Sequence, residues 1–286
     1  MDHPISAATA ENVARTPRII AHRGASTEAP EHTYAAYAAA LEAGADGLEC
    51  DVRLTADGHL VCVHDRRVNR TSNGTGFVSF LELSRLEELD FGSWHEPPEA
   101  KAGAKVANDD EEPDWDANRV LTLRRLLDLV AAQTRRVELA IEVKHPSRYA
   151  GQVERSLIAL LDEYGWAPRR ADQASPVRIM GFSSSAVRRA QRLAPGVRTV
   201  FLMEPLVYRA RGGALPAGTR IAGPSIEILR TRPEAVRRWH RAGCEVHVWT
   251  VDEPTDFELC LSLGVDAVIT NRPRAMRAAL AAAPVE

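Results

Sequence analysis

Short motifs that combine acidic, basic and imidazole side chains stand near the ends of several hydrophobic segments of this chain. Imidazole can accept or release a proton near neutral pH, and guanidinium and ammonium groups bind phosphate oxygens. Carboxylates can pair with such cations or hold a metal ion. The combination predicts chemistry at a phosphate group. The motifs are His22-Arg23-Gly24, Glu49-x-Asp51, His64-Asp65 and Glu142-x-Lys144.

The three acids of these motifs point to a metal site. Glu49 and Asp51 are two positions apart, so their side chains share one face of a strand, and Glu142 comes from the strand expected beside it. Buried carboxylates that converge are unfavourable unless a cation compensates them. A hard divalent ion with oxygen ligands, Mg²⁺ or Ca²⁺ with Mn²⁺ as a further candidate, would do so. The alternative is that these acids pair only with Arg23 and Lys144.

The remaining side chains of the motifs are candidates for proton transfer and phosphate binding. His22 and His64 are the candidate general acid and base, because both would flank the same carboxylates. Arg23 and Lys144 could neutralise a phosphodiester as it gains charge; structural pairing with the acids is the alternative. On later strands, Phe182 and the pair His247-x-Trp249 are expected at the same rim. Phe182 and Trp249 could line a substrate pocket or merely fill the barrel.

Eight Val- and Ile-rich segments are predicted strands, and helix-like stretches separate most of them. This alternation over about 250 residues predicts a (β/α)8 TIM barrel, an α/β fold whose catalytic groups stand at the carboxyl ends of the strands. A doubly wound open sheet is the main rival, but no G-x-G-x-x-G motif follows a strand. The predicted strands are 18–23, 47–52, 137–144, 177–183, 197–203, 220–226, 244–251 and 266–270.

Helices are predicted from apolar periodicity and from the residues that begin or end them. Three of them stop at Gly44, Gly243 and Gly264, the residue type that closes helices in the left-handed conformation. Thr122 is expected to cap a further helix. The stretches between the strands are 32–44, 151–165, 184–194, 232–243 and 254–264.

A ninth hydrophobic run, residues 59–64, is predicted to form a hairpin with the second strand across the turn T-A-D-G. A parallel crossover would need a dozen or more residues, which this connection lacks. If the turn occupies 55–58, Leu54 pairs with His59 and Glu49 faces His64. The hairpin then brings His64 beside the acids and leaves the barrel at eight strands.

Composition and charge indicate an ordinary globular protein. The chain has 286 residues, 45% of them hydrophobic and 26% charged, with a net charge of −3. This balance argues against a dedicated nucleic-acid binder. We expect an N-terminal extension over 1–17 and a single catalytic barrel over 18–286, with a charged, proline-rich insertion over 66–119.

The N-terminal segment and the cysteines bear on location. The first 18 residues are polar and contain no apolar core of a signal peptide, and no run approaches the ~20 apolar residues of a membrane span. The four cysteines are scattered, and no C-x-x-C pair occurs. These features predict a cytoplasmic protein without a membrane span and with reduced thiols.

The run from residue 19 to residue 65, IIAHRGASTEAPEHTYAAYAAALEAGADGLECDVRLTADGHLVCVHD, resembles the glycerophosphodiester phosphodiesterase family. The family pattern is HRG, P-E-N-T, GAD-x-x-E-x-D-V, T-x-D-G and H-D, and weaker matches follow in order as far as residue 273. The resemblance implies a TIM barrel that uses a divalent metal to hydrolyse small glycerophosphodiesters to glycerol 3-phosphate and an alcohol. It also implies that the insertion covers the active site. The matched positions are Glu49, Asp51 and Glu142 for the metal, His22 and His64 for acid and base, and Arg23 and Lys144 for phosphate.

Departures from the family pattern and two rival functions accompany this resemblance. P-E-N-T reads P-E-H-T, so His32 stands near the rim and is a further candidate for the substrate pocket; W-T-V-N reads W-T-V-D, with Asp252.

One rival is a lyase or phospholipase D-like enzyme that cleaves lysophospholipids to a cyclic phosphate. The other is a non-catalytic phosphate-binding barrel. The spacing from HRG to H-D and the presence of both histidines favour the phosphodiesterase.

Overall fold

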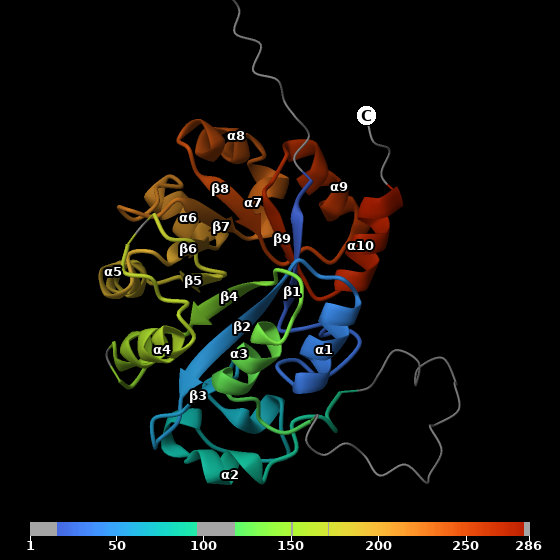
Figure 1. Cartoon of the computed structure of the whole chain (residues 1–286). Coiled ribbons are helices and arrows are strands. Elements are labelled where there is room, and N and C mark those ends of the chain that lie inside the picture. The colour runs from blue at the N-terminus through green and yellow to red at the C-terminus, as the bar shows by residue number, and fades with distance from the viewer. Residues whose placement is uncertain (1–15, 96–117, 150, 171, 283–286) are drawn as a thin grey trace, which may run out of the picture.

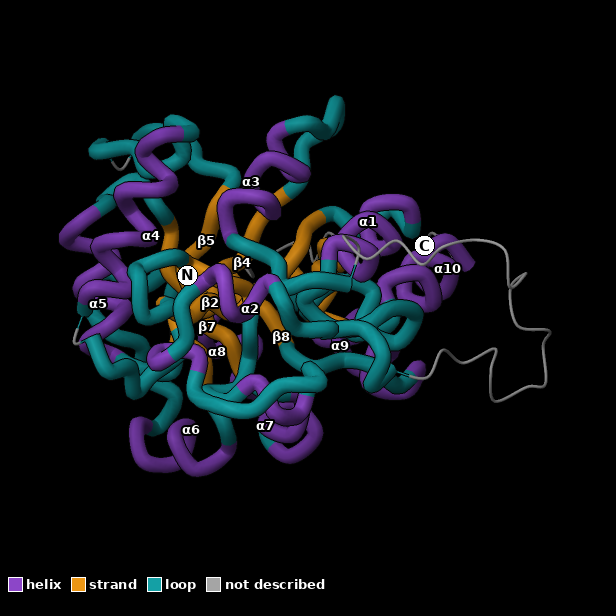
Figure 2. The backbone as a smooth tube through the Cα atoms, turned by 90° about the horizontal axis from the view of Figure 1, so that it is seen from below, coloured by secondary structure: helices purple, strands orange, loops and turns teal. Residues whose placement is uncertain are grey.

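The computed structural model describes residues 16–95, 118–149, 151–170 and 172–282 of the chain. Parallel strands close into a barrel in the order β1-β2-β4-β5-β6-β7-β8-β9, with β9 pairing back to β1. Helices surround the strands on the outside (Figures 1 and 2). The predicted TIM barrel is therefore confirmed, with strand ends shifted by at most three residues. The strands are β1 (Arg18–His22), β2 (Gly47–Leu54), β4 (Glu138–Val143), β5 (Val177–Gly181), β6 (Arg198–Met203), β7 (Ile221–Pro224), β8 (Glu245–Val248) and β9 (Ala267–Thr270).

The predicted helices form where apolar residues recur at helical spacing and where residues that begin or end helices flank them. Gly44, Gly243 and Gly264 follow three of them with φ of 76°, 71° and 66°, as their residue type predicted. Thr122 caps its helix by accepting a hydrogen bond from the backbone N–H of Arg125. The predicted helices are α1 (Tyr34–Glu42), α3 (Leu123–Ala131), α4 (Gln152–Glu163), α5 (Ser184–Leu193), α8 (Glu234–Arg241) and α9 (Pro254–Leu263).

Three outer helices were not predicted, namely α6 (Pro205–Arg211), α7 (Ile226–Thr231) and α10 (Pro273–Ala282). The first two span only seven and six residues, too few for an apolar period to repeat. Among the described residues, none of the helices is both long and apolar enough to cross a lipid bilayer.

The predicted hairpin is present, but its register differs by one residue. Strand β3 (Leu60–Cys62) pairs antiparallel with the end of β2, outside the closed barrel, and Leu54 faces Leu60 rather than His59. The loop holds five residues instead of four. Thr55 closes it: its backbone N–H donates to His59 O, and its Oγ1 accepts from His59 N–H, both at 2.9 Å. Gly58, with φ of 90°, supplies the left-handed position that this wider loop requires.

The first part of the insertion packs on this hairpin. It contains η1 (Val68–Arg70), η2 (Val78–Phe80) and α2 (Leu83–Glu87), which lie beside β3 at one side of the barrel (Figure 1). Its buried apolar side chains form a cluster of their own with two valines of the hairpin region. The cluster consists of Val61, Val63, Val68, Val78, Leu86, Leu89, Phe91 and Val120.

Two segments named by the sequence analysis lie outside the described residues. They are most of the N-terminal extension, residues 1–15, and residues 96–117 of the insertion, which contain its prolines. The domain boundaries at 17 and 18, and the extent of the insertion over 66–119, therefore stay predictions.

The barrel interior is filled rather than hollow. An apolar layer occupies its middle, built from residues of several strands such as Ile20, Met180 and Leu202. Below it, at the amino ends of the strands, lies a layer of paired charges. The pairs join Arg18 to Glu138 at 3.1 Å, Arg18 to Glu245 at 2.8 Å, Arg198 to Glu245 at 2.8 Å and Arg178 to Glu138.

His247 belongs to this lower layer, so its expected place at the carboxyl rim was wrong. Its Nε2 lies 3.0 Å from Glu245 and 3.1 Å from Arg18. Residue 247 precedes the end of β8, and only Trp249, two residues on, reaches the open end. Burial, Arg178 and Arg18 lower the pKa of His247 to about 4, although the hydrogen bond to Glu245 opposes the shift.

The pKa of His247 predicts an acid-sensitive contribution to stability. The ordinary value is 6.5 and the folded value about 4, so below pH 6.5 the unfolded chain binds a proton that the folded chain refuses. The contribution of His247 to stability is therefore fully present above pH 6.5 and is lost as the pH falls toward 4. Between pH 7.5 and 5 this loss amounts to about 2 kcal/mol. We expect His247→Gln to remove it, as measured by melting temperature across this pH range.

The wild type and His247→Gln are compared by the slope of melting temperature against pH and not by the melting temperature at one pH. His247→Gln also removes a hydrogen bond at every pH, which shifts its whole curve. The exposed His59→Gln is the matched control and should follow the wild-type slope, because its side chain is 55% exposed. Parallel curves for His247→Gln and the wild type would contradict this role for His247.

Candidate active site

A cavity of about 190 Å³ opens at the carboxyl ends of the barrel strands. Ionisable groups from β1, β2, β4 and the loop after β3 line one side, and apolar side chains from β5, β6 and β8–β9 line the other. Most of the residues singled out from the sequence meet here. Those that line the cavity are His22, Arg23, Glu49, His64, Glu142, Lys144, Phe182 and Trp249.

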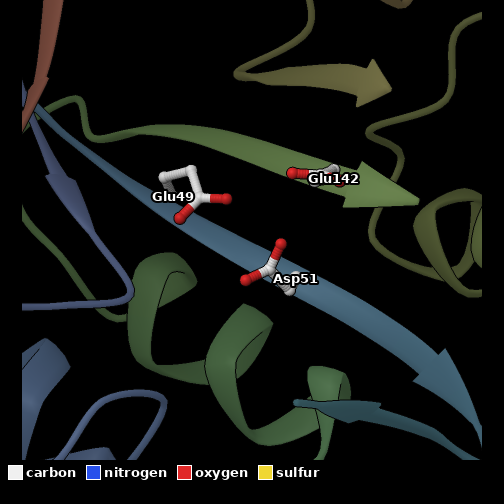
Figure 3. Close-up of side chains that lie close together, drawn as sticks. All are labelled: Glu49, Asp51 and Glu142. Carbon is white, nitrogen blue, oxygen red and sulfur yellow. The ribbon is translucent and has the colours of Figure 1, made fainter. Parts of the chain in front are cut away.

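The three acids converge, as the sequence predicted. Glu49 and Asp51 point from one face of β2, and Glu142 points toward them from β4, where it is the register partner of Asp51 (Figure 3). A carboxylate oxygen from each lies within 4.8 Å of the others. Their exposures are only 2%, 1% and 8%, because both strands are buried on both faces.

Two cations partly compensate this buried charge. Arg23 Nε lies 3.1 Å from Asp51, and Lys144 Nζ lies 3.2 Å from Asp51 and 2.9 Å from Glu142. Although burial alone would raise it, the pKa of Asp51 is held well below its usual range by His32, Lys144 and Arg23. The ion pairs that the sequence left open as an alternative are thus present in the protein.

Glu49 and Glu142 are less well compensated than Asp51. Burial and the charge of Asp51 raise the pKa of Glu142 to about 7 and raise that of Glu49 well above its usual range. The Asp51 Oδ1 atom is shielded from solvent and makes no hydrogen bond within the described residues, although Lys144 Nζ lies 3.2 Å from it. Three hard oxygen donors whose negative charge is only partly compensated fit a divalent cation, and Glu49, Asp51 and Glu142 would hold it.

The HRG motif forms a tight turn that attaches the first strand to the acids. After β1 the chain enters the left-handed region, with φ of 58° at Arg23 and 86° at Gly24. The Arg23 backbone N–H then donates to Glu49 O and Oε2, both at 3.1 Å. A Cβ at Gly24 would stand 2.6 Å from the Ala36 backbone, so only glycine lets α1 approach this closely.

His22 is oriented by a chain of hydrogen bonds that no sequence motif predicts. Its Nδ1 lies 2.7 Å from Asn271 Oδ1, while Asn271 Nδ2 donates to Asp252 Oδ2 at 2.6 Å. Because the carboxylate of Asp252 only accepts, the amide oxygen must face His22, and Nδ1 of His22 must donate. Nε2 then carries the free lone pair, 3.9 Å from Glu49. Burial and Arg23 lower the pKa of His22 to about 3, so this imidazole is neutral.

His64 reaches the cavity from the loop after β3. It does not face Glu49, because the β2–β3 hairpin register differs by one residue from the predicted one. Its Nδ1 lies 2.7 Å from Asp65 Oδ1, and Asp65 in turn accepts from Arg70 Nε at 2.7 Å. Burial, with Arg23 and Lys144, lowers the pKa of His64, and Asp51 and Asp65 oppose the shift. Nε2 is thereby left to face the cavity as the second proton-transfer atom.

His32 does not line the cavity, although its position near the rim suggested a place in the substrate pocket. Its side chain is buried behind Asp51, with Nε2 2.9 Å from Asp51 Oδ2 and Nδ1 2.8 Å from the Tyr37 hydroxyl. Its backbone is left-handed, with φ of 61°, a region that asparagine and histidine enter more readily than most residues. His32 therefore acts on the site through Asp51 and, by way of the Tyr37 hydroxyl that donates to Glu49 O at 3.1 Å, through the backbone of Glu49.

Aromatic side chains form the opposite wall of the cavity. Phe182 and Trp249 meet edge to face with ring centroids 5.5 Å apart, and Trp249 Nε1 donates to Gly223 O at 2.8 Å. Both rings are thus fixed in place at the rim. Glu204, which follows β6, also lines the cavity; it belongs to none of the sequence motifs, so its place here was not predicted.

Comparisons with known proteins agree with the resemblance. The protein-family model described as "Glycerophosphoryl diester phosphodiesterase family" matches residues 22–275. The chain is 44% identical over 266 residues to "Probable glycerophosphodiester phosphodiesterase 1" of Mycobacterium tuberculosis, covering 92% of each. It is 33% identical over 258 residues to a glycerophosphodiester phosphodiesterase of Caldanaerobacter subterraneus, covering 90% of this chain and 95% of that one. A glycerophosphodiester phosphodiesterase structure from Agrobacterium tumefaciens shares the fold at a TM-score of 0.70 and 27% identity, covering 92% and 99% of the two chains.

The charge balance of the acids predicts an unusual response to Glu49→Gln. Without a metal, Glu49 opposes folding at pH 7.5, because its pKa is raised in the folded protein and the unfolded chain carries it as a carboxylate. We expect Glu49→Gln to melt no lower than the wild type in the presence of a chelator. Added Mg²⁺, Mn²⁺ or Ca²⁺ should raise the wild-type melting temperature. At an ion concentration of 100 times Kd, the free energy of unfolding rises by ~2.7 kcal/mol. The variant should lose this increase.

The exposed Glu227→Gln, on α7, is the control for a change of carboxylate that leaves the cluster intact, and it should keep the wild-type response. Differential scanning fluorimetry after chelation and dialysis measures both quantities. A Glu49→Gln protein that still gains the full metal increment would show that the ion binds elsewhere.

Proposed function

We propose a function from one premise: this chain belongs to the glycerophosphoryl diester phosphodiesterase family, whose model matches most of its length. The chain hydrolyses glycerophosphodiesters to glycerol 3-phosphate and an alcohol. The observation that carries the proposal is the meeting of three buried carboxylates with two histidines and two cations around one cavity. Phosphodiester hydrolysis needs these three components to neutralise charge, activate an oxygen nucleophile and protonate the departing alkoxide.

The phosphate group would lie between the cations and the acid cluster. Arg23 offers a planar guanidinium and Lys144 a point charge, and both suit phosphate oxygens. Their present contacts with the acids do not prevent this, because both side chains also border the cavity. A divalent ion held by the acid cluster would neutralise charge that develops on the phosphate oxygens. Mg²⁺ or Ca²⁺, with Mn²⁺ as a further candidate, remains the prediction for its identity.

His22 serves as the general base in this proposal and His64 as the general acid. The Asp252–Asn271 chain supports the first role, since it leaves the lone pair of His22 Nε2 directed toward the site. His22 then takes a proton either from water or from the glycerol 2-hydroxyl. The carboxylate of Asp65 supports the second role, because it stabilises a protonated His64, and the negative charge of a bound phosphodiester would add to this effect.

The glycerol end of the substrate would occupy the aromatic side of the cavity. Phe182 and Trp249 offer a rigid surface for a small polyol, and the alcohol end then extends past His64 and Lys144. The partner of this chain is a small molecule in this proposal, and neither nucleic acid nor a membrane span is part of it. The cytoplasmic location expected from the N-terminal sequence stays a prediction.

Activity toward glycerophosphocholine, glycerophosphoethanolamine and glycerophosphoinositol, each with Mg²⁺, Mn²⁺ and Ca²⁺ in turn, tests the proposed function directly. We expect hydrolysis that a chelator abolishes and one of these ions restores. A cyclic phosphate that accumulates as the final product would instead favour the lyase alternative. No turnover of any of these substrates with any ion would favour the phosphate-binding barrel.

The two histidines should be distinguishable by the leaving group. A choline alkoxide needs a proton to depart, whereas a nitrophenolate needs little help. General acid catalysis is typically worth ~10²–10⁴-fold. We expect His64→Ala to lose about this factor in kcat/KM on glycerophosphocholine and far less on a glycerol nitrophenyl phosphodiester. His22→Ala should lose activity on both, because each substrate needs an activated nucleophile.

His59→Ala is the matched control, since His59 lies on the exposed hairpin loop and should affect neither substrate. If His22→Ala and His64→Ala each lose the same factor on both substrates, neither histidine is a dedicated leaving-group acid. The division of roles would then be wrong, while the hydrolytic function would stand.

A further inference from the structure

A second, larger cavity adjoins the active site. It encloses about 470 Å³ and shares Lys144 with the active-site cavity. Residues 77–80 of the insertion form one wall, and Lys144 with residues 146–149, which follow β4, forms the other. The cavity therefore exists only because the insertion is folded against the barrel.

Positive charge gathers in this second cavity. Arg53, Arg66 and Arg148 line it together with Lys144, and none of the described residues that line it is acidic. Within the part of the chain that the structure describes, these three arginines donate only to backbone carbonyls or lie against aromatic rings. Arg53 donates to His64 O at 2.6 Å and Arg66 to Pro146 O at 3.4 Å. Arg148 lies 4.4 Å above the ring of Phe80.

This lack of carboxylate partners contrasts with the closed end of the same barrel. There Arg18, Arg178 and Arg198 each pair with a glutamate. Lys144 is already paired with Asp51 and Glu142, whereas Arg53, Arg66 and Arg148 have no carboxylate within hydrogen-bond distance among the described residues. Arg66 and Arg148 are exposed, so their guanidinium groups are accessible to an anion that enters the cavity.

A neutral donor in the same cavity also lacks a partner. Ser147 Oγ is shielded from solvent and makes no hydrogen bond within the described residues. Such a shielded hydroxyl is costly unless a ligand satisfies it. After rotation of the Ser147 side chain toward the cavity, an oxyanion could accept from its hydroxyl and from the arginines at once.

The position of the second cavity ties it to the departing alcohol. Lys144 stands between the two cavities, and the Arg53 guanidinium holds the backbone of His64, the proposed acid. Phe182 and Trp249, the proposed glycerol wall, line the active-site cavity only. An alcohol protonated by His64 would accordingly extend into the second cavity.

We propose that this second cavity binds an anionic group on the alcohol, so that the enzyme prefers glycerophosphodiesters whose alcohol carries a further phosphate. The inference rests on the proposed hydrolysis and specifies its substrate class. A cationic alcohol such as choline would meet repulsion from the arginines, and a neutral one would leave them and Ser147 without partners. A phosphate satisfies both, since guanidinium groups bind its oxygens in pairs.

Matched substrate pairs test this preference. One pair is glycerophosphoinositol 4-phosphate and glycerophosphoinositol; the other is glycerophosphoglycerol phosphate and glycerophosphoglycerol. We expect the wild type to favour the phosphorylated member of each pair in kcat/KM by about tenfold, which corresponds to ~1.4 kcal/mol. The preference should shrink as salt is raised, because partly exposed charges are screened. A preference in both pairs assigns the effect to charge, and a preference in one pair adds a requirement for the shape of that alcohol.

Arginine variants show whether the cavity is responsible. Arg66→Gln/Arg148→Gln should reduce the phosphorylated-to-unphosphorylated ratio to near one. Arg53 stays wild type in this experiment, because its guanidinium holds the backbone of His64. The control is Arg237→Gln, an exposed arginine on α8, which should keep the wild-type ratio. A double variant that loses the same factor on both members of a pair would overturn the proposal.

Two further outcomes separate this inference from the proposed function. If the wild type hydrolyses both members of each pair equally, the inference fails and the hydrolytic function stands. If it hydrolyses none of them, binding of inositol 4-phosphate against inositol, measured by calorimetry with glycerol 3-phosphate present, tests the cavity alone. Binding of inositol 4-phosphate that the double variant weakens about tenfold supports the inference, and equal binding to both proteins overturns it.

Discussion

The structure depends on one electrostatic constraint: three carboxylates stand on the buried faces of adjacent barrel strands. Ionised groups at this depth are unfavourable unless cations or donors face them. Arg23 and Lys144 supply part of the compensation. The glycine turn, which brings the Arg23 N–H to Glu49, and His32, which donates toward Asp51, supply more. Much of the local geometry at this rim follows from the need to surround those oxygens.

Charged side chains are compensated differently at the two ends of the barrel. At the amino ends, the arginines and glutamates pair with one another, and the layer is complete without any ligand. At the carboxyl ends, Glu49 and Glu142 keep raised pKa values because burial and Asp51 outweigh the available cations. The first arrangement favours the folded state alone, whereas the second favours a bound cation. Charge balance therefore distinguishes the structural end of this barrel from the reactive one.

The sequence predicted those features that depend on local pattern. Alternation of buried strands with capped helices predicted the barrel, and the i, i+2 spacing of Glu49 and Asp51 predicted a shared face. Features that depend on tertiary contacts escaped prediction. The hairpin register depends on how Thr55 closes its loop, and His247 differs from a rim residue only by its depth in β8.

The least predictable part of the site is the set of groups that orient others. Asn271 belongs to no expected site, and Asp252 was noticed only as a departure from a motif; the chain of hydrogen bonds from Asp252 through Asn271 to His22 reveals their role. His32 was noticed as a departure from a motif, but its place behind Asp51 follows from the packing of α1. The second cavity likewise joins segments far apart in the chain, so no local pattern announces it.

The filled interior and the paired charges at the closed end give the active site a single mouth. In the proposed orientation, both products form at this end of the barrel, with glycerol 3-phosphate against the aromatic wall at the rim and the alcohol toward the second cavity. Because an apolar layer fills the interior, the products leave through the opening by which the next substrate enters. Glycerol 3-phosphate keeps the phosphate that Arg23 and Lys144 would bind, so it competes with substrate for the free enzyme.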